Sequence, residues 1–557
     1  MKNLQRGDRA VGLGVALSYF WWLFRTTKSL GFSRDESFYF HAAGSYAGWF
    51  KLLFAGKKEA FKQPIIDLYW NTNHEHPALV KSLFAISWMF LHEKWKWIEH
   101  PSLALRVPGM AFGALGVYIT YLFGCRLHSR VAGLAAAFSL ALIPSVFYHS
   151  HLACFDVPVM TMWAVALYAY WQATHSRTWL TAVWAGVAYG LLLETKHNAW
   201  MLPGVILPHA MWVYGRASQG LPKKKLVPWP LLSMATIGPA VFYALWPWIW
   251  NDTKARLNEY AAFHLNHEYY NIEYLGRNYY GPPSPPSYAP VLIGATVPTI
   301  TLLLAFVGIV LAGRSWRVLL RPSPDESGRS VIDEVSGRLL VLLGMLVPIA
   351  VFFLPKTPIF GGTKHWLPAY PLLCVFAGLG FAAVASYLSA FIASKPAWKD
   401  GLAKHPSIAI AFLGALFFAS PALETAHSHP FGLSTYVPTI GGTRGGANLG
   451  LNRQFWGFTT QSLAPYFAAH AKPGENVFIH DTTGGAWQAL QNEGRMRSDL
   501  GGSIWTIQDT QWAFVHHEFH MIETETNIWT VYGTPTPAYV LTHDGVPIIT
   551  LYKKPAK

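Results

Sequence analysis

Residues 10–41 read AVGLGVALSYFWWLFRTTKSLGFSRDESFYFH, and this stretch decides the fold class. Residues 10–24 form an apolar run, and no small-residue cleavage site follows it, so the run predicts a retained membrane span rather than a signal peptide. The adjacent charged residues Arg34, Asp35 and Glu36 come soon after this span. Three charges beside a membrane boundary require a partner or a function.

The rest of the chain shares this apolar character. Hydrophobic residues make up 52% of the 557 positions and charged residues only 13%, whereas an ordinary soluble domain has about 25% charged residues. Apolar runs close to the ~20 residues that cross a bilayer recur as far as residue 423. We therefore predict a mainly α-helical, polytopic membrane bundle over residues 1–424 and a small soluble α/β domain over residues 425–557.

The predicted soluble domain has strand, helix and turn signals of its own. The stretches NVFIHD (476–481), AYVLTH (538–543) and VPIITLYK (546–553) read as strands, and TGGAWQALQNEG (483–494) reads as a helix. Asp544 and Gly545 separate the last two strands. An Asp-Gly pair in this position predicts a β-hairpin turn.

Basic residues in the short loops predict the orientation of the bundle. The formal net charge is +14, but the Lys and Arg residues gather in loops such as CRLHSR and YGRASQGLPKKKL, where they mark the cytoplasmic side. We therefore expect no nucleic-acid partner. Eleven spans are predicted, near 10–24, 107–124, 131–148, 157–173, 180–193, 198–213, 229–248, 291–312, 338–354, 367–390 and 407–423.

A further apolar stretch, 77–92, is short and begins with Pro77. The basic loops all fall on one side of the membrane only if this stretch does not cross, so it predicts an interfacial or re-entrant helix in the first outer loop. The N-terminus is then cytoplasmic and the C-terminus lies outside. This orientation predicts that the first loop (25–106), the end of the fourth span and the predicted soluble domain (425–557, called the tail below) lie on the same outer face.

Polar side chains meet repeatedly at this outer boundary. A single Lys or His there is more often structural than catalytic, but a set of charges at membrane depth usually marks a site. Carboxylates in such a pocket can take a proton from an incoming hydroxyl, and cations suit a developing phosphate charge. The candidates are Asp35, Glu36, Glu75, His76, Lys81, Arg106, Asp156, Lys196, His264, His267, Arg277, Lys364 and His365.

The order of five motifs resembles a known group. RDESFYF, EHPALVK, LALRVPGMAFG, FDVP and GTKHWLPAYPLL follow one another over roughly residues 10–390. This order resembles the membrane glycosyltransferases of the C superfold, and most nearly the protein O-mannosyltransferases and the lipid A aminoarabinose transferases. The resemblance implies a glycosyltransferase that moves a hexosyl or pentosyl unit from a polyprenyl-phosphate donor to an acceptor hydroxyl or amine, with inversion.

The resemblance also implies roles for the candidates. Asp35 falls at the position of the catalytic base, with Glu36 as its support, and HPALVK resembles a stretch on an interfacial helix. His76 departs from the pattern, because the aminoarabinose branch has a phosphate-binding lysine there. The lipid phosphate is then expected to rely more on Arg106, Lys196, Arg277 or Lys364. Asp156 and Glu75 are expected to face the sugar or acceptor. The full set of residues expected from the resemblance to bind the donor phosphate is His76, Lys81, Arg106, Lys196, Arg277, Lys364 and His365.

A metal ion is a further expectation from the resemblance. In the aminoarabinose branch the glutamate at the position of Glu75 shares a metal with a loop histidine, for which His264 and His267 are the candidates here. The mannosyltransferase branch is not thought to need a metal. We therefore expect no required cofactor, with a divalent metal as an option.

Two other functions compete with the transferase. A lipid or solute transporter, such as a flippase, would have charges at mid-depth and broken helices in related halves, whereas these charges cluster on one side. A scaffold protein whose outer domain does the work would leave the ordered motifs unexplained. The expected partners are a polyprenyl-phosphate sugar, membrane lipids and an acceptor protein, lipid or glycan. The expected location is a bacterial inner membrane, with the site and C-terminus facing the periplasm.

Overall fold

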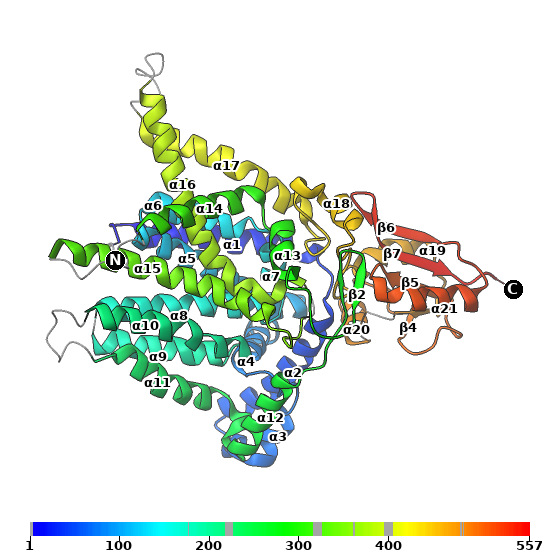
Figure 1. Ribbon diagram of the computed structural model, residues 1–557. Coiled ribbons are helices and arrows are strands. Elements are labelled where there is room, and N and C mark those ends of the chain that lie inside the picture. The colour runs from blue at the N-terminus through cyan, green and yellow to red at the C-terminus, as the bar shows by residue number, and fades with distance from the viewer. Residues whose placement is uncertain are drawn as a thin grey trace.

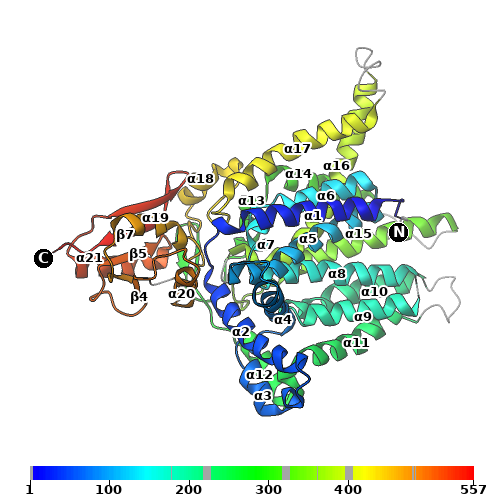
Figure 2. The same ribbon diagram turned by 180° about the vertical axis from the view of Figure 1, so that it is seen from behind.

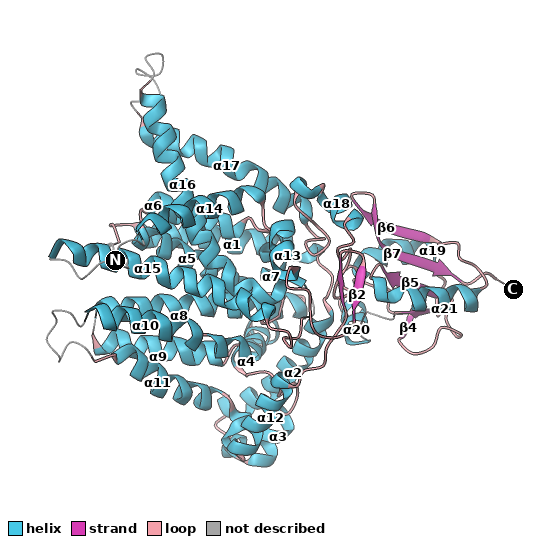
Figure 3. Ribbon diagram, viewed as in Figure 1, coloured by secondary structure: helices cyan, strands magenta, loops and turns pink. Residues whose placement is uncertain are grey.

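The computed structural model describes residues 4–176, 178–217, 227–315, 326–359, 362–394, 405–479, 482 and 484–556. Most of these residues are helical, and long helices lie side by side in one bundle (Figure 1). The strands gather at one end of the molecule, beside the C-terminus (Figure 3). The bundle helices are α1 (Asp8–Thr26), α5 (Pro101–Leu127), α6 (Arg130–Ala141), α7 (Pro144–Ser150), α8 (Asp156–Ser176), α9 (Trp179–Leu193), α10 (Pro203–Ala217), α11 (Trp229–Leu245), α13 (Tyr288–Thr296), α14 (Thr299–Ser315), α15 (Glu326–Ala350), α16 (Tyr370–Ala393) and α17 (Pro406–Ser428).

Several bundle helices have the length and hydropathy of membrane spans. Among the described residues, four helical segments meet both criteria, and two bent helix pairs, α6 with α7 and α13 with α14, meet them together. The apolar helices α9 and α11 are shorter. The chain is a multi-pass membrane protein, while the count of eleven spans and their orientation stay predictions.

Small residues let several bundle helices approach closely. A Cβ atom on Gly380 of α16 would collide with the backbone of Leu304 in α14, and one on Gly308 would collide with the backbone of Phe376. A Cβ atom on Gly378 would likewise collide with the backbone of Ala132 in α6. Close backbone contact of this kind is the usual packing mode of membrane helices, and it fixes α16 between α6 and α14.

The segment between α1 and α5, predicted to be the first outer loop, folds into helices that lie against one end of the bundle. They are α2 (Arg34–Phe54), α3 (Gln63–Trp70) and α4 (Leu79–Ser87), and a π-helical segment continues α4 over Trp88–Lys94. In Figures 1 and 2, α4 is viewed close to end-on, whereas α1, α5 and α8 lie along the page. The stretch 77–92 therefore does not run alongside the bundle helices. A lobe of α3 and α12 (Thr253–Leu265) lies beside α2.

The tail contains a mixed five-stranded sheet in the order β4-β3-β5-β7-β6. Strand β3 is parallel to β4 and β5, and β7 is antiparallel to β5 and β6. Asp544 and Gly545 join β6 to β7 with positive φ angles of 51° and 76°, so the predicted Asp-Gly hairpin is confirmed. The strands are β3 (Asn476–Phe478), β4 (Gly501–Ser503), β5 (Trp512–His516), β6 (Tyr539–His543) and β7 (Val546–Lys553), and the helices of the tail are α18 (Gly442–Asn448), α19 (Ala464–His470), α20 (Gly484–Asn492) and α21 (Ile522–Tyr532).

The tail docks on the start of α2 and α5. Phe32, just before α2, belongs to the same apolar cluster as Phe467 and Trp487 of the tail. The carboxylate of Glu493 accepts hydrogen bonds from the backbone amide and the hydroxyl of Ser102, both at 2.7 Å. A Cβ atom on Gly31 would collide with the carbonyl of Phe458, so a glycine is required there for the tail to reach α2. A small hairpin, β1 (Ile272–Tyr274) with β2 (Arg277–Tyr279), also contacts the tail through Gly276 and Gly450.

Candidate active site

The site begins at the first turn of α2. Ser33 and Glu36 form a reciprocal capping box, in which the Glu36 carboxylate accepts a hydrogen bond from the Ser33 amide at 3.0 Å. This interaction satisfies otherwise unpaired amides and fixes the direction in which α2 starts. Arg34 is exposed, and its amide donates to the carbonyl of Trp456 at 2.9 Å. The box therefore sets where Asp35, between Arg34 and Glu36, points.

Asp35 forms an ion pair with a buried lysine. The Asp35 carboxylate is 3.5 Å from the Lys364 ammonium, and their side chains are 27% and 5% exposed. The Lys364 ammonium also lies 4.0 Å from the ring centre of Trp456 and 5.6 Å from that of Phe455. Lys364 belongs to the 3₁₀ segment Gly362–Ala369, directly before α16. Residues far apart in the sequence thus enclose one partly open carboxylate.

A second ion pair lies close enough to Lys364 to interact with it electrostatically. Asp156, the first residue of α8, accepts a hydrogen bond from Lys196 at 2.8 Å, and their side chains are 4% and 14% exposed. Lys364 acts electrostatically on Asp156, and both lysines act on His149. The carboxylates of Asp35, Asp156 and Glu75 all act electrostatically on the Tyr39 hydroxyl. The structure therefore brings the two carboxylate–ammonium pairs together at one end of the bundle.

Glu36 and Arg106 form a buried ion pair with each other, which was not predicted from the sequence. Both side chains are fully buried, and the guanidinium of Arg106 donates to the Glu36 carboxylate through Nε and Nη2, both at 2.7 Å. Arg106 also donates to the carbonyl of Gly31 at 2.6 Å and covers the ring of Phe32 at 5.0 Å. This geometry leaves no open face toward a lipid phosphate. The pair is a structural lock behind Asp35. Arg106 was expected to contact the lipid phosphate and Glu36 to support Asp35, but in the structure the buried guanidinium of Arg106 is paired with Glu36 instead.

The predicted His76 lies in a cluster of imidazoles. The ring of His264 is 4.0 Å from that of His197 and 5.5 Å from that of His76, measured between ring centres. Burial, with a smaller contribution from nearby histidines and lysines, lowers the pKa of His76 and of His197. Burial also lowers the pKa of His264 to about 4. All three imidazoles are therefore neutral at pH 7, and they supply hydrogen bonds rather than charge.

Lys81 is buried beneath this cluster. It donates to the backbone carbonyls of Asn73 and His76 and lies 5.1 Å from the ring centre of Tyr46. Burial lowers the pKa of Lys81 to about 7, although Glu75 and Glu194 oppose the shift. Because its donors hold the turn at residues 73–76, Lys81 fixes the loop in front of α4 rather than presenting an ammonium to the surface.

The predicted metal ligands do not converge. His264 Nε2 lies 2.8 Å from the backbone carbonyl of Glu75, not from its carboxylate, and His267 Nδ1 lies 2.8 Å from the carbonyl of Glu268. The Glu75 carboxylate instead accepts a hydrogen bond from Asn73 at 2.6 Å. In the described part of the chain, three metal-binding side chains converge elsewhere, at His427, His543 and Asp544.

Two other predicted residues lie at the edge of the site. His365 is half-buried, with its ring 5.5 Å from Phe352, and it acts electrostatically on His197. Arg277 is exposed on β2, and no contact within the described ranges joins it to Asp35 or Asp156. Their predicted phosphate contacts stay predictions.

Trp456 and Phe455 are members of the site that the sequence motifs did not identify. They lie in the stretch QFWGF (454–458), where Trp456 has a positive φ of 73°. A non-glycine residue in that conformation is uncommon and marks a position fixed by its surroundings. The aromatic residues beside Gly457 were the only signal in the sequence for this part of the site. The contact of the Trp456 ring with Lys364 depends on the tertiary fold.

The imidazole cluster gives a prediction for the stability of the protein. An unfolded histidine has a pKa of about 6.5, and His264 has a folded pKa of about 4. As the pH falls from 7 toward 4, the unfolded chain takes up protons that the folded chain does not, so the free energy of unfolding decreases by up to about 1.4 kcal/mol per pH unit for this histidine. We expect the melting temperature in detergent to fall between pH 7 and pH 5.

The variant His264→Gln isolates this contribution. It should melt with a shallower pH dependence than the wild type over the same range, whereas His470→Ala, which replaces an exposed histidine of the tail, should keep the wild-type slope. Equal slopes for the wild type and His264→Gln would contradict the assignment of a neutral, buried His264.

Comparisons with known proteins agree with the resemblance found in the sequence. Residues 87–248 match the model of the family described as dolichyl-phosphate-mannose-protein mannosyltransferase. This segment contains Arg106, Asp156 and Lys196 but neither Asp35 nor Lys364. No curated protein sequence matches the chain significantly.

Solved structures similar to the chain include ArnT and an oligosaccharyltransferase. The apo structure of ArnT from Cupriavidus metallidurans is 15% identical over 97% of each chain, with a TM-score of 0.47, and its complex with undecaprenyl phosphate is 14% identical over 97% of each chain, with a TM-score of 0.46. The apo oligosaccharyltransferase of Archaeoglobus fulgidus is 10% identical over 95% of this chain and 72% of the other, with a TM-score of 0.49. The match of residues 87–248 to the mannosyltransferase family model confirms the resemblance of this segment to the protein O-mannosyltransferases.

Proposed function

We propose that this protein is an inverting glycosyltransferase that moves one sugar from a polyprenyl-phosphate donor to an acceptor hydroxyl or amine. The observation that carries the proposal is the pair of Asp35 and Lys364, a partly exposed carboxylate beside a buried ammonium at one end of an apolar helical bundle. The description of the family matched by residues 87–248 contains the same donor chemistry, a sugar on a lipid phosphate.

The reaction assigns a different task to each member of the two ion pairs. The Asp35 carboxylate accepts the proton of the acceptor as its oxygen or nitrogen forms a bond to the anomeric carbon. The bond from that carbon to the phosphate oxygen breaks, and its electron pair stays on the lipid phosphate. The ammonium groups of Lys364 and Lys196 stabilise the negative charge that develops there. Because there is one attack and no covalent intermediate, the anomeric configuration inverts.

Asp156 and Trp456 complete the site in this proposal. Asp156 holds Lys196 by a 2.8 Å hydrogen bond, so it positions one phosphate-binding cation. Trp456 covers Lys364 from the tail side and, with Phe455, presents aromatic surface on which a sugar ring can pack. His76 contributes a neutral imidazole where related enzymes use a charge, so the phosphate depends more on Lys196 and Lys364. No metal is assigned to this step.

The location follows from the predicted orientation. The basic loops predict a cytoplasmic N-terminus, and the end of the bundle with Asp35 and the tail would then face the opposite side. In a bacterial inner membrane this side is the periplasm. The acceptor would then be a protein, lipid or glycan of that compartment.

Turnover of lipid-linked sugars by the purified protein tests the proposal. A panel of radiolabelled polyprenyl-phosphate sugars, each with protein, lipid and glycan acceptors, is incubated with the protein in nanodiscs. The expected result is release of polyprenyl phosphate that requires an acceptor and yields an inverted product. The competing transporter would instead move an intact lipid-linked sugar across a vesicle membrane, and movement without release would overturn the proposal.

A further inference from the structure

A cluster of two histidines and one aspartate, which includes neither Asp35 nor Lys364, lies where the bundle meets the tail. His427 is in the last turn of α17, His543 is the last residue of β6, and Asp544 is in the turn between β6 and β7. One ligand atom from each of the three lies within 4.8 Å of the others. Figure 1 shows α17 leading from the bundle toward α18 and β6.

The three side chains point at one another. His427 Nε2 is 2.8 Å from Asp544 Oδ1, and His543 Nε2 is 3.8 Å from Asp544 Oδ2. The two imidazole rings lie 5.5 Å apart with an interplanar angle of 29°. A simple ion pair would account for His427 and Asp544. It would not account for a second imidazole that is stacked beside the first and directed at the same carboxylate.

The carboxylate and the imidazole are held by neighbouring groups. Thr443 donates to Asp544 Oδ2 at 2.8 Å, and Arg444 Nε donates to the Asp544 carbonyl at 2.6 Å. The ring of His543 packs against Phe431 at 5.2 Å, and the hydroxyl of Thr435 lies 3.0 Å from its Nε2. Such outer contacts orient the ligands of protein metal sites. On metal binding, Nε2 of His543 would bind the ion and would no longer form a hydrogen bond with the Thr435 hydroxyl.

We propose that His427, His543 and Asp544 bind a zinc ion that fastens the tail to the end of α17. Two imidazole nitrogens and one carboxylate oxygen are a ligand set that suits zinc better than magnesium or calcium. Bonds of about 2.0–2.1 Å in a tetrahedral site place ligand atoms roughly 3.3–3.5 Å apart. In the structure the two imidazoles approach different oxygens of Asp544, at 2.8 Å from Oδ1 and 3.8 Å from Oδ2, and one ligand atom from each residue lies within 4.8 Å of the others, so small side-chain movements bring the ligands to these separations. Water completes the coordination.

The site would cross-link the membrane bundle to the tail sheet. His427 belongs to a helix with the length and hydropathy of a membrane span, whereas His543 and Asp544 belong to the hairpin of β6 and β7. Because the ligands come from both parts, zinc would stabilise their docked arrangement. The inference does not depend on the proposed transfer reaction, so either can fail without the other.

Zinc binding by the full-length protein tests the inference. The protein is purified in detergent, stripped with a chelator and dialysed, and zinc is measured by mass spectrometry and titration calorimetry. The expected result is one zinc ion per chain and a higher melting temperature on its addition. Asp544→Asn should lose this zinc ion and the shift. Asparagine tolerates the positive φ of this position, so the variant should still fold.

Two further variants sharpen the test. His427→Ala removes a mostly exposed ligand and should also abolish binding, whereas His470→Ala, a matched histidine of the tail, should bind as the wild type does. Thr443→Val should weaken the affinity about 10-fold or more, because it frees the Asp544 carboxylate to rotate. If the wild type binds no zinc, or Asp544→Asn binds as much as the wild type, the inference is wrong.

Discussion

Replacing Asp35 by asparagine is expected to lower the rate of sugar transfer about 10²–10⁴-fold, the range that general-base catalysis supplies. Asparagine keeps the size of the side chain and its hydrogen-bonding shape, but it cannot accept the proton of the acceptor. The Asp35 side chain is 27% exposed, and the capping box that starts α2 uses Ser33 and Glu36 instead. The variant should therefore fold normally, and the loss should appear in the rate rather than in the amount of folded protein.

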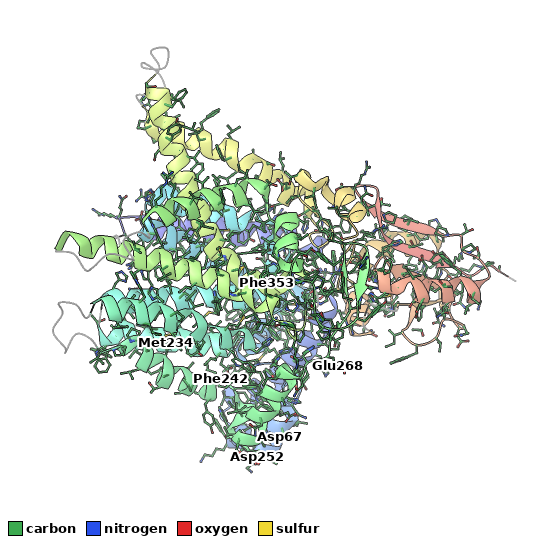
Figure 4. All side chains as sticks on the ribbon, in the orientation of Figure 1. Asp67, Met234, Phe242, Asp252, Glu268 and Phe353 are labelled. Atoms are coloured by element: carbon green, nitrogen blue, oxygen red, sulfur yellow. The ribbon has the colours of Figure 1, made fainter. Side chains whose placement is uncertain are left out.

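Asp67→Asn is the matched control for this substitution. Asp67 pairs with Arg256 at 2.7 Å on the lobe of α3 and α12, where Figure 4 labels it near Asp252. The same change of charge there should leave the rate of transfer within about twofold of the wild type, because Asp67 pairs with Arg256 on this lobe and not with the residues of the candidate site. Measurement of acceptor-dependent release of polyprenyl phosphate compares the two variants directly. An equal loss in both would indicate a nonspecific effect of charge.

Replacing Arg106 by methionine is expected to destabilise the protein by about 3–5 kcal/mol, because it leaves the Glu36 carboxylate buried without its partner. The pair is fully buried and bidentate. Arg106 and Arg495 also lie on Phe32, at 5.0 and 5.2 Å from its ring centre, so one lock joins α2, α5 and the tail. The prediction is checked by chemical or thermal unfolding in detergent.

A second substitution separates charge from packing. The double variant with Glu36→Gln and Arg106→Met should recover part of the lost stability, because no unpaired charge stays buried. Lys51→Met breaks the exposed pair with Glu93, whose side chains are 52% and 33% exposed, and should cost less than about 1 kcal/mol. If Arg106→Met were no more destabilising than Lys51→Met, the structural role of the pair would be refuted.

The sequence allowed local features to be predicted well. Apolar run lengths predicted the bundle of helices, and the Asp-Gly pair predicted the hairpin of β6 and β7, because both depend on nearby residues. The order of motifs pointed to Asp35, Asp156 and Lys364, the polar residues at the predicted outer boundary added Lys196, and the structure brings these four together. The count of spans and their orientation depend on a membrane as well as on the chain, so they stay predictions.

The features that were missed depend on contacts between distant residues. Glu36 was predicted to support Asp35 because the two are neighbours in the sequence. In the structure its carboxylate forms a buried ion pair with Arg106 on α5. The spacing of Ser33 and Glu36 was the one local signal of its capping role. Trp456 meets Lys364 only because the tail docks on α2, and His427 meets Asp544 only because α17 ends beside the hairpin. Such pairings follow from tertiary packing, which a single sequence does not specify locally.

The most direct test of the central claim, that Asp35 and Lys364 form one catalytic unit, is single-turnover sugar transfer by the wild type, Asp35→Asn, Lys364→Met and the double variant, at equal amounts of folded protein. Residues that act as a unit have strongly non-additive effects. The account predicts that each single variant loses most of the rate and that the double variant loses little more than Asp35→Asn alone. Wild-type transfer by Asp35→Asn, or losses that simply multiply in the double variant, would contradict it.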